Sequence, residues 1–202
     1  MEERRISLAQ LDVLREIGTI GAGRAATALS EMLNTKVEIT LPETNLIPLE
    51  NLDRILGDPE KPLFVLDTGL QGEISGRALF LLSPEDGKIL GSILLGKKAE
   101  EINSDDLLFQ SCLKEVVNIL TGAHMNALSD ITGLSILYGV PSLALDMVSA
   151  LLDFIFIQIA QHSEEAFFIR TDLKVKDINF NTIFLFFPDQ LSLKKIFEVL
   201  SI

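Results

Sequence analysis

Three polar residues at helical spacing are the part of the sequence best suited to chemistry. Ser111, Glu115 and Asn118 stand at positions i, i+4 and i+7. At about 100° per residue they fall within roughly 60° of one another on one face of a helix. The row offers a hydroxyl, a carboxylate and a carboxamide to solvent, and Pro141 follows Asn118 after twenty-two residues. The opposite face is apolar at three- and four-residue steps, which predicts a half-buried helix; its residues are Phe109, Cys112, Leu113, Val116, Val117, Leu120 and Ala127.

A second row lies ninety-nine positions earlier in the chain. Asp12, Glu16 and Thr19 have the same spacing, and Pro42 follows Thr19 after the same twenty-two residues. The repeat of both intervals predicts an internal duplication. A single polar helix face is ordinarily only solvated, but two copies with equal spacing are hard to attribute to solvation, so the pattern indicates function.

Conventional catalytic sets are missing from the sequence. His124 and His162 are the only histidines and have no cysteine partners, so no metal site is predicted. His124 points to the apolar side of its helix and is interpreted as a core histidine. The glycines at 18–23 lie inside a helix rather than after a strand, which argues against a nucleotide loop. They indicate close approach of another backbone, either the twin helix or a partner protein.

Composition limits the classes of partner. The chain has 202 residues, 48% of them hydrophobic, and a formal net charge of −12, so nucleic acid and anionic membrane are not expected partners. Cys112 is the only cysteine, and the first five residues lack the apolar core of a signal peptide, so we expect a cytoplasmic protein. The apolar stretch at 143–160 is interrupted by Asp146 and Asp153, which favours buried structure over a membrane span.

The expected fold class is α+β, a pseudo-twofold duplicated domain with a mostly antiparallel sheet packed by helices. Residues 1–202 form one domain of two repeats, about 7–97 and 104–202, because no Pro-, Gly- or Ser-rich linker separates them. Each repeat reads as helix, strand, short helix, hairpin and helix. We expect helices at 7–33 (capped by Ser7), 49–56, 85–95, 104–129 (capped by Ser104), 144–152 and 191–200 (opened by Pro188), and strands at 36–41, 63–70, 74–83, 134–140, 154–160, 165–175 and 180–187.

The two helical segments resemble the CheC phosphatases of bacterial and archaeal chemotaxis, in the superfamily that includes CheX and FliY. The resemblance is carried by Glu-Ile-Gly-Thr-Ile-Gly-Ala-Gly (16–23) and Glu-Val-Val-Asn-Ile-Leu-Thr-Gly (115–122) and extends through nearly the whole chain. The family pattern is Asp or Ser, three residues, Glu, two residues, Asn, twenty-two residues, Pro. The second row satisfies it in full, whereas the first has Thr19 in place of Asn.

The resemblance implies hydrolysis of the aspartyl phosphate on a CheY-type response regulator, which supplies its own Mg²⁺ and a lysine. Asn118 would orient the attacking water, and Glu115 would pair with that lysine. Ser111 would be at most a flanking contact. Thr19 is shorter than Asn and β-branched, so the first site is expected to be weak or inactive, although Glu16 could still help to dock the regulator. Thr19 itself either takes part in docking or is a helix-surface residue with no task.

Two other functions remain open. The chain could be a weakly catalytic or non-catalytic binding module that regulates the receptor deamidase CheD, or it could be a component of the flagellar switch. The second is disfavoured because no switch-type extension is expected in this sequence. Leu107, Leu108 and Met125 flank the polar row and could form either an apolar rim for a partner or part of the core.

Overall fold

The computed structural model describes residues 8–200, so the predicted cap Ser7 lies outside the described residues. The helices are α1 (Leu8–Leu33), α2 (Leu52–Leu56), α3 (Pro84–Leu95), α4 (Leu107–Thr132), α5 (Val148–Phe154) and α6 (Gln190–Val199), with 3-10 turns η1 (Leu49–Asn51) and η2 (Ala99–Glu101) and a π-helical turn η3 (Ile155–Ile159). The strands are β1 (Val37–Pro48), β2 (Pro62–Gly72), β3 (Gly76–Leu82), β4 (Ile136–Tyr138), β5 (Ser142–Met147), β6 (Glu165–Val175) and β7 (Ile178–Pro188).

All seven strands form one antiparallel sheet in the order β1-β6-β7-β3-β2-β4, and β5 also pairs with β2. The hairpins β2–β3 and β6–β7 meet in the centre through β3 and β7. The outer strand of each sequence half pairs with the hairpin of the other half, β1 with β6 and β4–β5 with β2. The α+β class with a pseudo-twofold antiparallel sheet is therefore confirmed.

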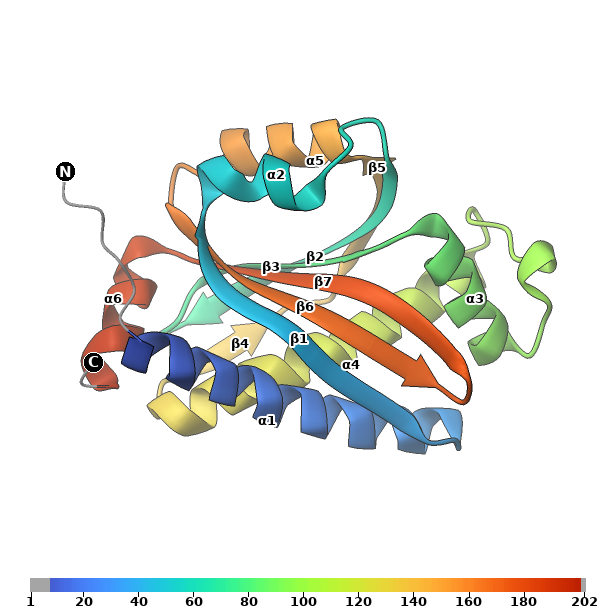
Figure 1. The fold of residues 1–202 in the computed structure, drawn as a ribbon, viewed down its shortest axis with the longest axis horizontal. Coiled ribbons are helices and arrows are strands. Elements are labelled where there is room, and N and C mark those ends of the chain that lie inside the picture. Colours follow the sequence, from blue (N-terminus) through green and yellow to red (C-terminus); the bar gives the residue numbers. More distant parts are fainter. Residues whose placement is uncertain (1–7, 201–202) are drawn as a thin grey trace.

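Helices cover both faces of the sheet (Figure 1). On one face α1 and α4 cross each other, and their apolar sides bury the larger core with Phe64, Phe109 and Phe184. On the other face α2 and α5 cover a smaller core that includes Leu52 and Phe168. The polar rows predicted on α1 and α4 are thus carried by two helices whose apolar sides are packed into the larger core, which fixes their orientation relative to the sheet.

The strands that follow the two long helices differ from the prediction. β1 continues past the predicted end at residue 41 to Pro48, with a shift of register between Thr40 and Glu43. The corresponding run in the second half is broken, because β4 ends at Tyr138 and β5 begins at Ser142. Pro42 lies in the register shift and Pro141 in the break. Proline has no backbone N–H to donate to a ladder, so each proline marks an interruption rather than the end of a strand.

The helix predicted at 144–152 is confirmed for 148–152 but wrong for 144–147, and the strand predicted at 154–160 was wrong in type. Residues 142–147 are strand β5 because they pair with β2 from Asp67 to Pro62. Residues 148–159 are helical, with Ile155 and Ile159 buried four positions apart and Phe156 and Ile157 exposed. The run of large apolar residues favoured a strand by propensity, but burial at helical spacing decided the outcome. None of the helices within residues 8–200 has a stretch long and apolar enough to cross a membrane.

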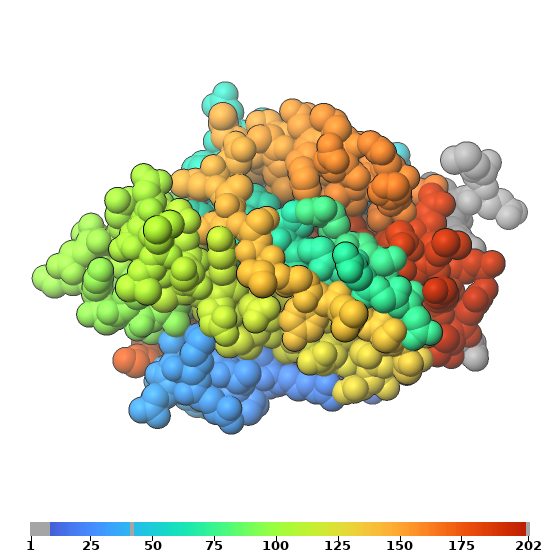
Figure 2. Space-filling view, turned by 180° about the vertical axis from the view of Figure 1, so that it is seen from behind, coloured from blue at the N-terminus to red at the C-terminus, as the bar shows by residue number. Residues whose placement is uncertain are grey.

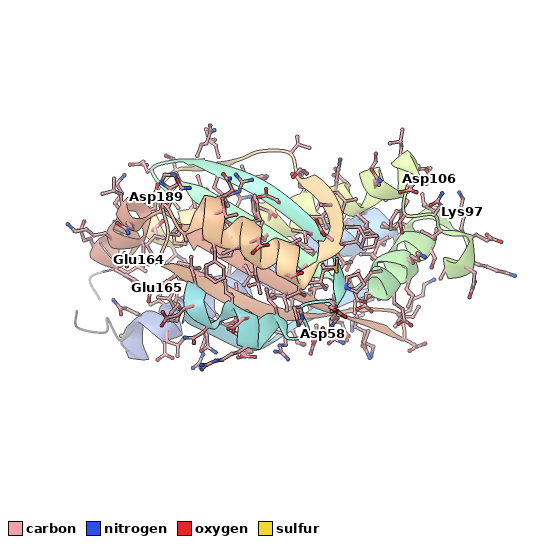
Figure 3. The ribbon with its side chains drawn as sticks, turned by 90° about the horizontal axis from the view of Figure 1, so that it is seen from above. Asp58, Lys97, Asp106, Glu164, Glu165 and Asp189 are labelled. Atoms are coloured by element: carbon pink, nitrogen blue, oxygen red, sulfur yellow. The ribbon has the colours of Figure 1, made fainter. Side chains whose placement is uncertain are left out.

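Two helix caps also differ from the prediction. The backbone N–H of Leu108 donates to the carboxylate of Asp106 over 2.8 Å, so α4 begins at Leu107 and not at Ser104. Asp189 caps α6 in the same way, accepting from Ser192 over 2.7 Å, whereas Pro188 is the last residue of β7. A carboxylate at a helix N-terminus also interacts favourably with the helix dipole. Figure 3 shows the two capping aspartates at opposite ends of the molecule.

Candidate active site

Helix α4 holds the complete polar row at the molecular surface. Its buried face includes Val116 and Val117, which are packed into the larger core and set the rotation of the helix. Ser111 and Glu115 are exposed, and Asn118 is half-buried. The Ser111 hydroxyl donates to the backbone carbonyl of Leu107 over 2.7 Å, so it is engaged within its own helix.

The Glu115 carboxylate and the Asn118 carboxamide are available to a partner. Within residues 8–200, neither side chain has a hydrogen bond or an ion pair. A carboxylate can pair with a cation, and a carboxamide can donate and accept at the same time. The two groups are one turn apart on one stripe, so a single partner surface can contact both.

Helix α1 also exposes its row, but two of its three groups are engaged locally. Asp12, Glu16 and Thr19 are all exposed. The Thr19 hydroxyl donates to the carbonyl of Arg15 over 2.8 Å, and the Arg15 guanidinium lies 3.6 Å from the Asp12 carboxylate. Glu16 is the member of this row that has no side-chain partner within the described residues.

The apolar residues beside the α4 row are divided between surface and core. Leu107 and Leu108 are exposed at the start of the helix, whereas Met125 is buried in the larger core. Half-buried Cys112 lies between the two faces. Burial, together with the Asp106 carboxylate, raises the pKa of the Cys112 thiol, which keeps it protonated and unreactive at neutral pH.

The two long helices approach each other closely at Gly21 of α1. A Cβ on Gly21 would lie 2.9 Å from the Cα of His124 on α4, so this glycine is required by the twin helix. A Cβ on Gly23 would meet nothing within 4 Å. His124 is buried, its Nδ1 lies 2.8 Å from the carbonyl oxygen of Leu120, and its ring stacks on Phe184. Burial lowers the pKa of His124, so the imidazole is neutral.

His124 is therefore a core residue, although its Nε2 has no hydrogen-bond partner within the described residues. No group of three or more His, Cys, Asp or Glu residues in the described part of the chain is arranged to hold a metal ion.

Sequence reasoning missed Tyr138. This β4 residue pairs with Leu70 of β2 and turns toward α4, where a Cβ on Gly122 would lie 2.6 Å from its hydroxyl oxygen. Figure 2 shows the β4–β5 segment beside α4 on this face of the molecule. One signal was present in the sequence: Gly122 stands eleven residues after Ser111, so a glycine takes the next position of the polar row.

Comparisons with known proteins agree with this architecture. The model of the CheC-like family matches residues 10–46. The chain is 30% identical over 166 residues to the CheY-P phosphatase CheC of Bacillus subtilis, which covers 81% of this chain and 79% of the relative. The crystal structure of Thermotoga maritima FliY superimposes with a TM-score of 0.76 and 19% identity over 97% of this chain and 98% of that one. CheX, in a complex with CheY, BeF3 and Mg²⁺ from Borrelia burgdorferi, gives a TM-score of 0.53 and 16% identity over 88% of this chain and 98% of that one.

The structural likenesses show the shared fold, and the sequence identity to Bacillus subtilis CheC extends over more than two thirds of both chains. The chain therefore belongs to the CheC-like family.

Proposed function

We propose that this chain hydrolyses the aspartyl phosphate of a CheY-type response regulator. The observation that carries the proposal is the pairing of Glu115 and Asn118 on one exposed stripe of α4, where neither has a side-chain partner among the described residues. Family membership supports it, since the Bacillus subtilis relative is named a CheY-P phosphatase and the CheX neighbour was solved with CheY.

The reaction requires no strong base on this chain. An acyl phosphate is already activated, so water attacks phosphorus, the bond from phosphorus to the aspartyl oxygen breaks, and the products are a free carboxylate and inorganic phosphate. The Asn118 carboxamide donates to one oxygen of the reacting group and accepts from the water. Both contacts fix the water in line with the bond that breaks.

Glu115 sets the position of the regulator. Its carboxylate pairs with the regulator's lysine beside the phosphoryl group, and the ion pair becomes stronger when docking removes it from water. The Mg²⁺ in this scheme belongs to the phosphorylated regulator. Docking of the regulator on α4 therefore depends on Glu115, and orientation of the water depends on Asn118, one turn later.

A second candidate function is a binding module that regulates a CheD-type receptor deamidase. The observation that favours it is the local bonding of Thr19 in α1, which leaves that copy of the row without a group to orient water. A chain with one altered row could act mainly by binding. The two functions differ in one measurable result, because only the first makes a phosphorylated regulator decay faster.

The test is a dephosphorylation time course of a phosphorylated CheY-type regulator with and without this protein. The wild-type chain should accelerate decay, and Asn118→Ala should lower the rate on the order of a hundredfold, the loss expected when a reacting group is no longer held in place. Asn179→Ala is the matched control, because Asn179 is an exposed asparagine on strand β7 and not on α4. It should retain the wild-type rate.

Two results would contradict the proposal. If the wild-type chain leaves the decay rate unchanged, the binding-module function is favoured. If Asn118→Ala and Asn179→Ala both retain full activity, hydrolysis does not depend on Asn118.

A further inference from the structure

The stripe of α4 that carries the polar row extends one turn further, to a position that is occupied by a glycine. Ser111, Glu115 and Asn118 are followed on the same stripe by Gly122, eleven residues after Ser111. A Cβ on Gly122 would lie 2.6 Å from the Tyr138 hydroxyl oxygen and 3.0 Å from Tyr138 Cζ. The phenol therefore occupies the space that a side chain at position 122 would need. A hydroxyl from β4 takes the fourth place in the row.

The position of Tyr138 is determined by the sheet. Tyr138 pairs with Leu70, and the N–H of Gly139 donates to the carbonyl of Gly69 over 3.0 Å, which fixes the end of β4 against β2. The Tyr138 side chain is 37% exposed, and within residues 8–200 its hydroxyl has no hydrogen bond. A tyrosine commonly combines an apolar ring that packs with a hydroxyl that stays available. The β4–β5 segment that carries Tyr138 lies beside α4 on this face of the molecule (Figure 2).

The first copy of the row lacks this feature. Gly23 stands ninety-nine positions before Gly122, and a Cβ there would meet nothing within 4 Å. The residue ninety-nine positions before Tyr138 is Ile39, an apolar β1 side chain packed against the larger core. Glycine weakens a helix interior, so a glycine in α4 calls for a structural reason, and the phenol provides one. Gly122, which the Tyr138 ring covers, and Asn118 therefore both belong to the α4 row.

We propose that Tyr138 is a docking residue of the Asn118 site, with its hydroxyl bonded to the phosphorylated regulator one turn beyond the amide. The inference rests on the proposed function, since it takes the regulator as the partner of this stripe. Cβ atoms four residues apart on a helix are about 5–6 Å apart, and helical side chains lean toward the N-terminus. Asn118 therefore leans away from the phenol. The hydroxyl contacts the partner and not the reacting water.

This placement predicts an effect on binding rather than on the chemical step. A hydrogen bond between neutral groups changes an equilibrium constant about two- to twelvefold. Tyr138→Phe should therefore raise KM for the phosphorylated regulator, and Kd for the same regulator loaded with BeF3, by about that factor. Because the amide and the acid remain in place, kcat should stay within about twofold of wild type.

Glycine substitutions provide a matched pair of variants. Gly122→Ala displaces both the hydroxyl and the ring edge, so its effect on KM and Kd should equal or exceed that of Tyr138→Phe. Gly23→Ala occupies the corresponding position of α1 and should leave both constants unchanged. In a Tyr138→Ala background, Gly122→Ala should add less than about twofold, because no phenol remains to be displaced. Thermal unfolding of each variant checks that the fold is retained.

The readouts separate this inference from the proposed function. If wild type accelerates decay and Tyr138→Phe leaves KM and Kd unchanged, the docking role is overturned and the phosphatase stands. A fall in kcat at constant KM overturns it as well, since the hydroxyl then acts in the chemical step. If wild type binds the BeF3-loaded regulator without accelerating decay, and Tyr138→Phe weakens that binding, the phosphatase fails and the docking role stands. Absence of both binding and acceleration overturns both.

Discussion

Helices α1 and α4 carry the same row of polar positions on equivalent elements, but their side chains are engaged differently. Glu16 and Glu115 are both exposed and without a side-chain partner among the described residues. Four residues after Arg15, the Thr19 hydroxyl is bonded to the Arg15 carbonyl, whereas Asn118 leaves its carboxamide free at the corresponding place. The acid is therefore retained in both copies, and the group that could orient a water is present in one.

The surroundings of the two rows differ as well. Tyr138 closes the α4 row at Gly122, while the α1 row ends at an open Gly23. The core sides also differ, because His124 on α4 corresponds to Ala25 on α1, and both are buried. The two helices thus present equivalent positions with different side chains, and we propose that these side chains decide which row acts. The following predictions test that division, beginning with the largest expected effect.

The acids of the two rows should not be equivalent in the reaction. Glu115→Gln removes the charge that we propose pairs with the regulator during docking. Loss of one partner of an interfacial charge pair costs about 2 kcal/mol or more, so kcat/KM should fall by about thirtyfold or more, mainly through KM. Glu16→Gln should change kcat/KM by less than about threefold, as for an exposed charge outside the working interface. Steady-state kinetics measure both variants, and equal losses would show that both rows dock the substrate.

The crossing point of the two helices should tolerate no side chain from α1. In Gly21→Ala, the new methyl would contact the backbone of His124, and overpacking of this kind costs about 1–3 kcal/mol of unfolding free energy. Gly23→Ala, two positions later, should raise stability by up to about 1 kcal/mol because it improves helix propensity without a contact. Urea unfolding of both variants provides the test. If Gly21→Ala is as stable as Gly23→Ala, the helices can separate without cost.

The histidine on the core side of α4 should make stability depend on pH. Burial lowers the pKa of His124 below 6.5, so below about pH 6.5 the unfolded chain binds a proton that the native chain does not. The unfolding free energy should therefore decrease as pH falls from 7.5 to 5, by at most about 1.4 kcal/mol per pH unit. Glu73 and Asp189 also have lowered pKa values, but their ordinary values of 4.5 and 3.8 place their effect at lower pH.

Substitution of each histidine in turn identifies the origin of this dependence. His124→Leu should flatten the profile between pH 7.5 and 5, because it removes the buried group that titrates there. His162→Gln is the control, since His162 is exposed, and should keep the slope. A slope that survives His124→Leu would assign the effect to another group.

Local patterns predicted the helices and rows well. The 3.6-residue period gave α1 and α4, and the equal intervals gave the exposed stripes, because both depend on residues within a few turns of one another. The strands after these helices were less predictable. β5 is a strand because β2 lies beside it, and the helical turns at 148–159 follow burial that only the assembled core creates. Tertiary contacts decide the structure in both cases, strand pairing for β5 and burial for 148–159.

The hydroxyl at the fourth place of the α4 row could not be predicted from residue spacing. Tyr138 is sixteen residues after Gly122 and reaches it because a break after β4 and pairing with β2 fold the chain back over α4. The glycine in the row was visible in the sequence, but the residue that fills its place was not. Contacts within one helix follow from the spacing of residues in the sequence, whereas contacts between a helix and a strand require the three-dimensional structure.

Rebuilding the α1 row should produce the smallest effect and the sharpest comparison. Thr19→Asn replaces a hydroxyl bonded to its own helix by a longer carboxamide on an exposed face beside unpaired Glu16. In the wild-type background, a second working site can at most double the rate, so the gain should stay below about twofold. In the Asn118→Ala background, the same change should restore measurable dephosphorylation. If the double variant Asn118→Ala/Thr19→Asn remains as inactive as Asn118→Ala, the α1 row differs from the α4 row by more than the residue at position 19.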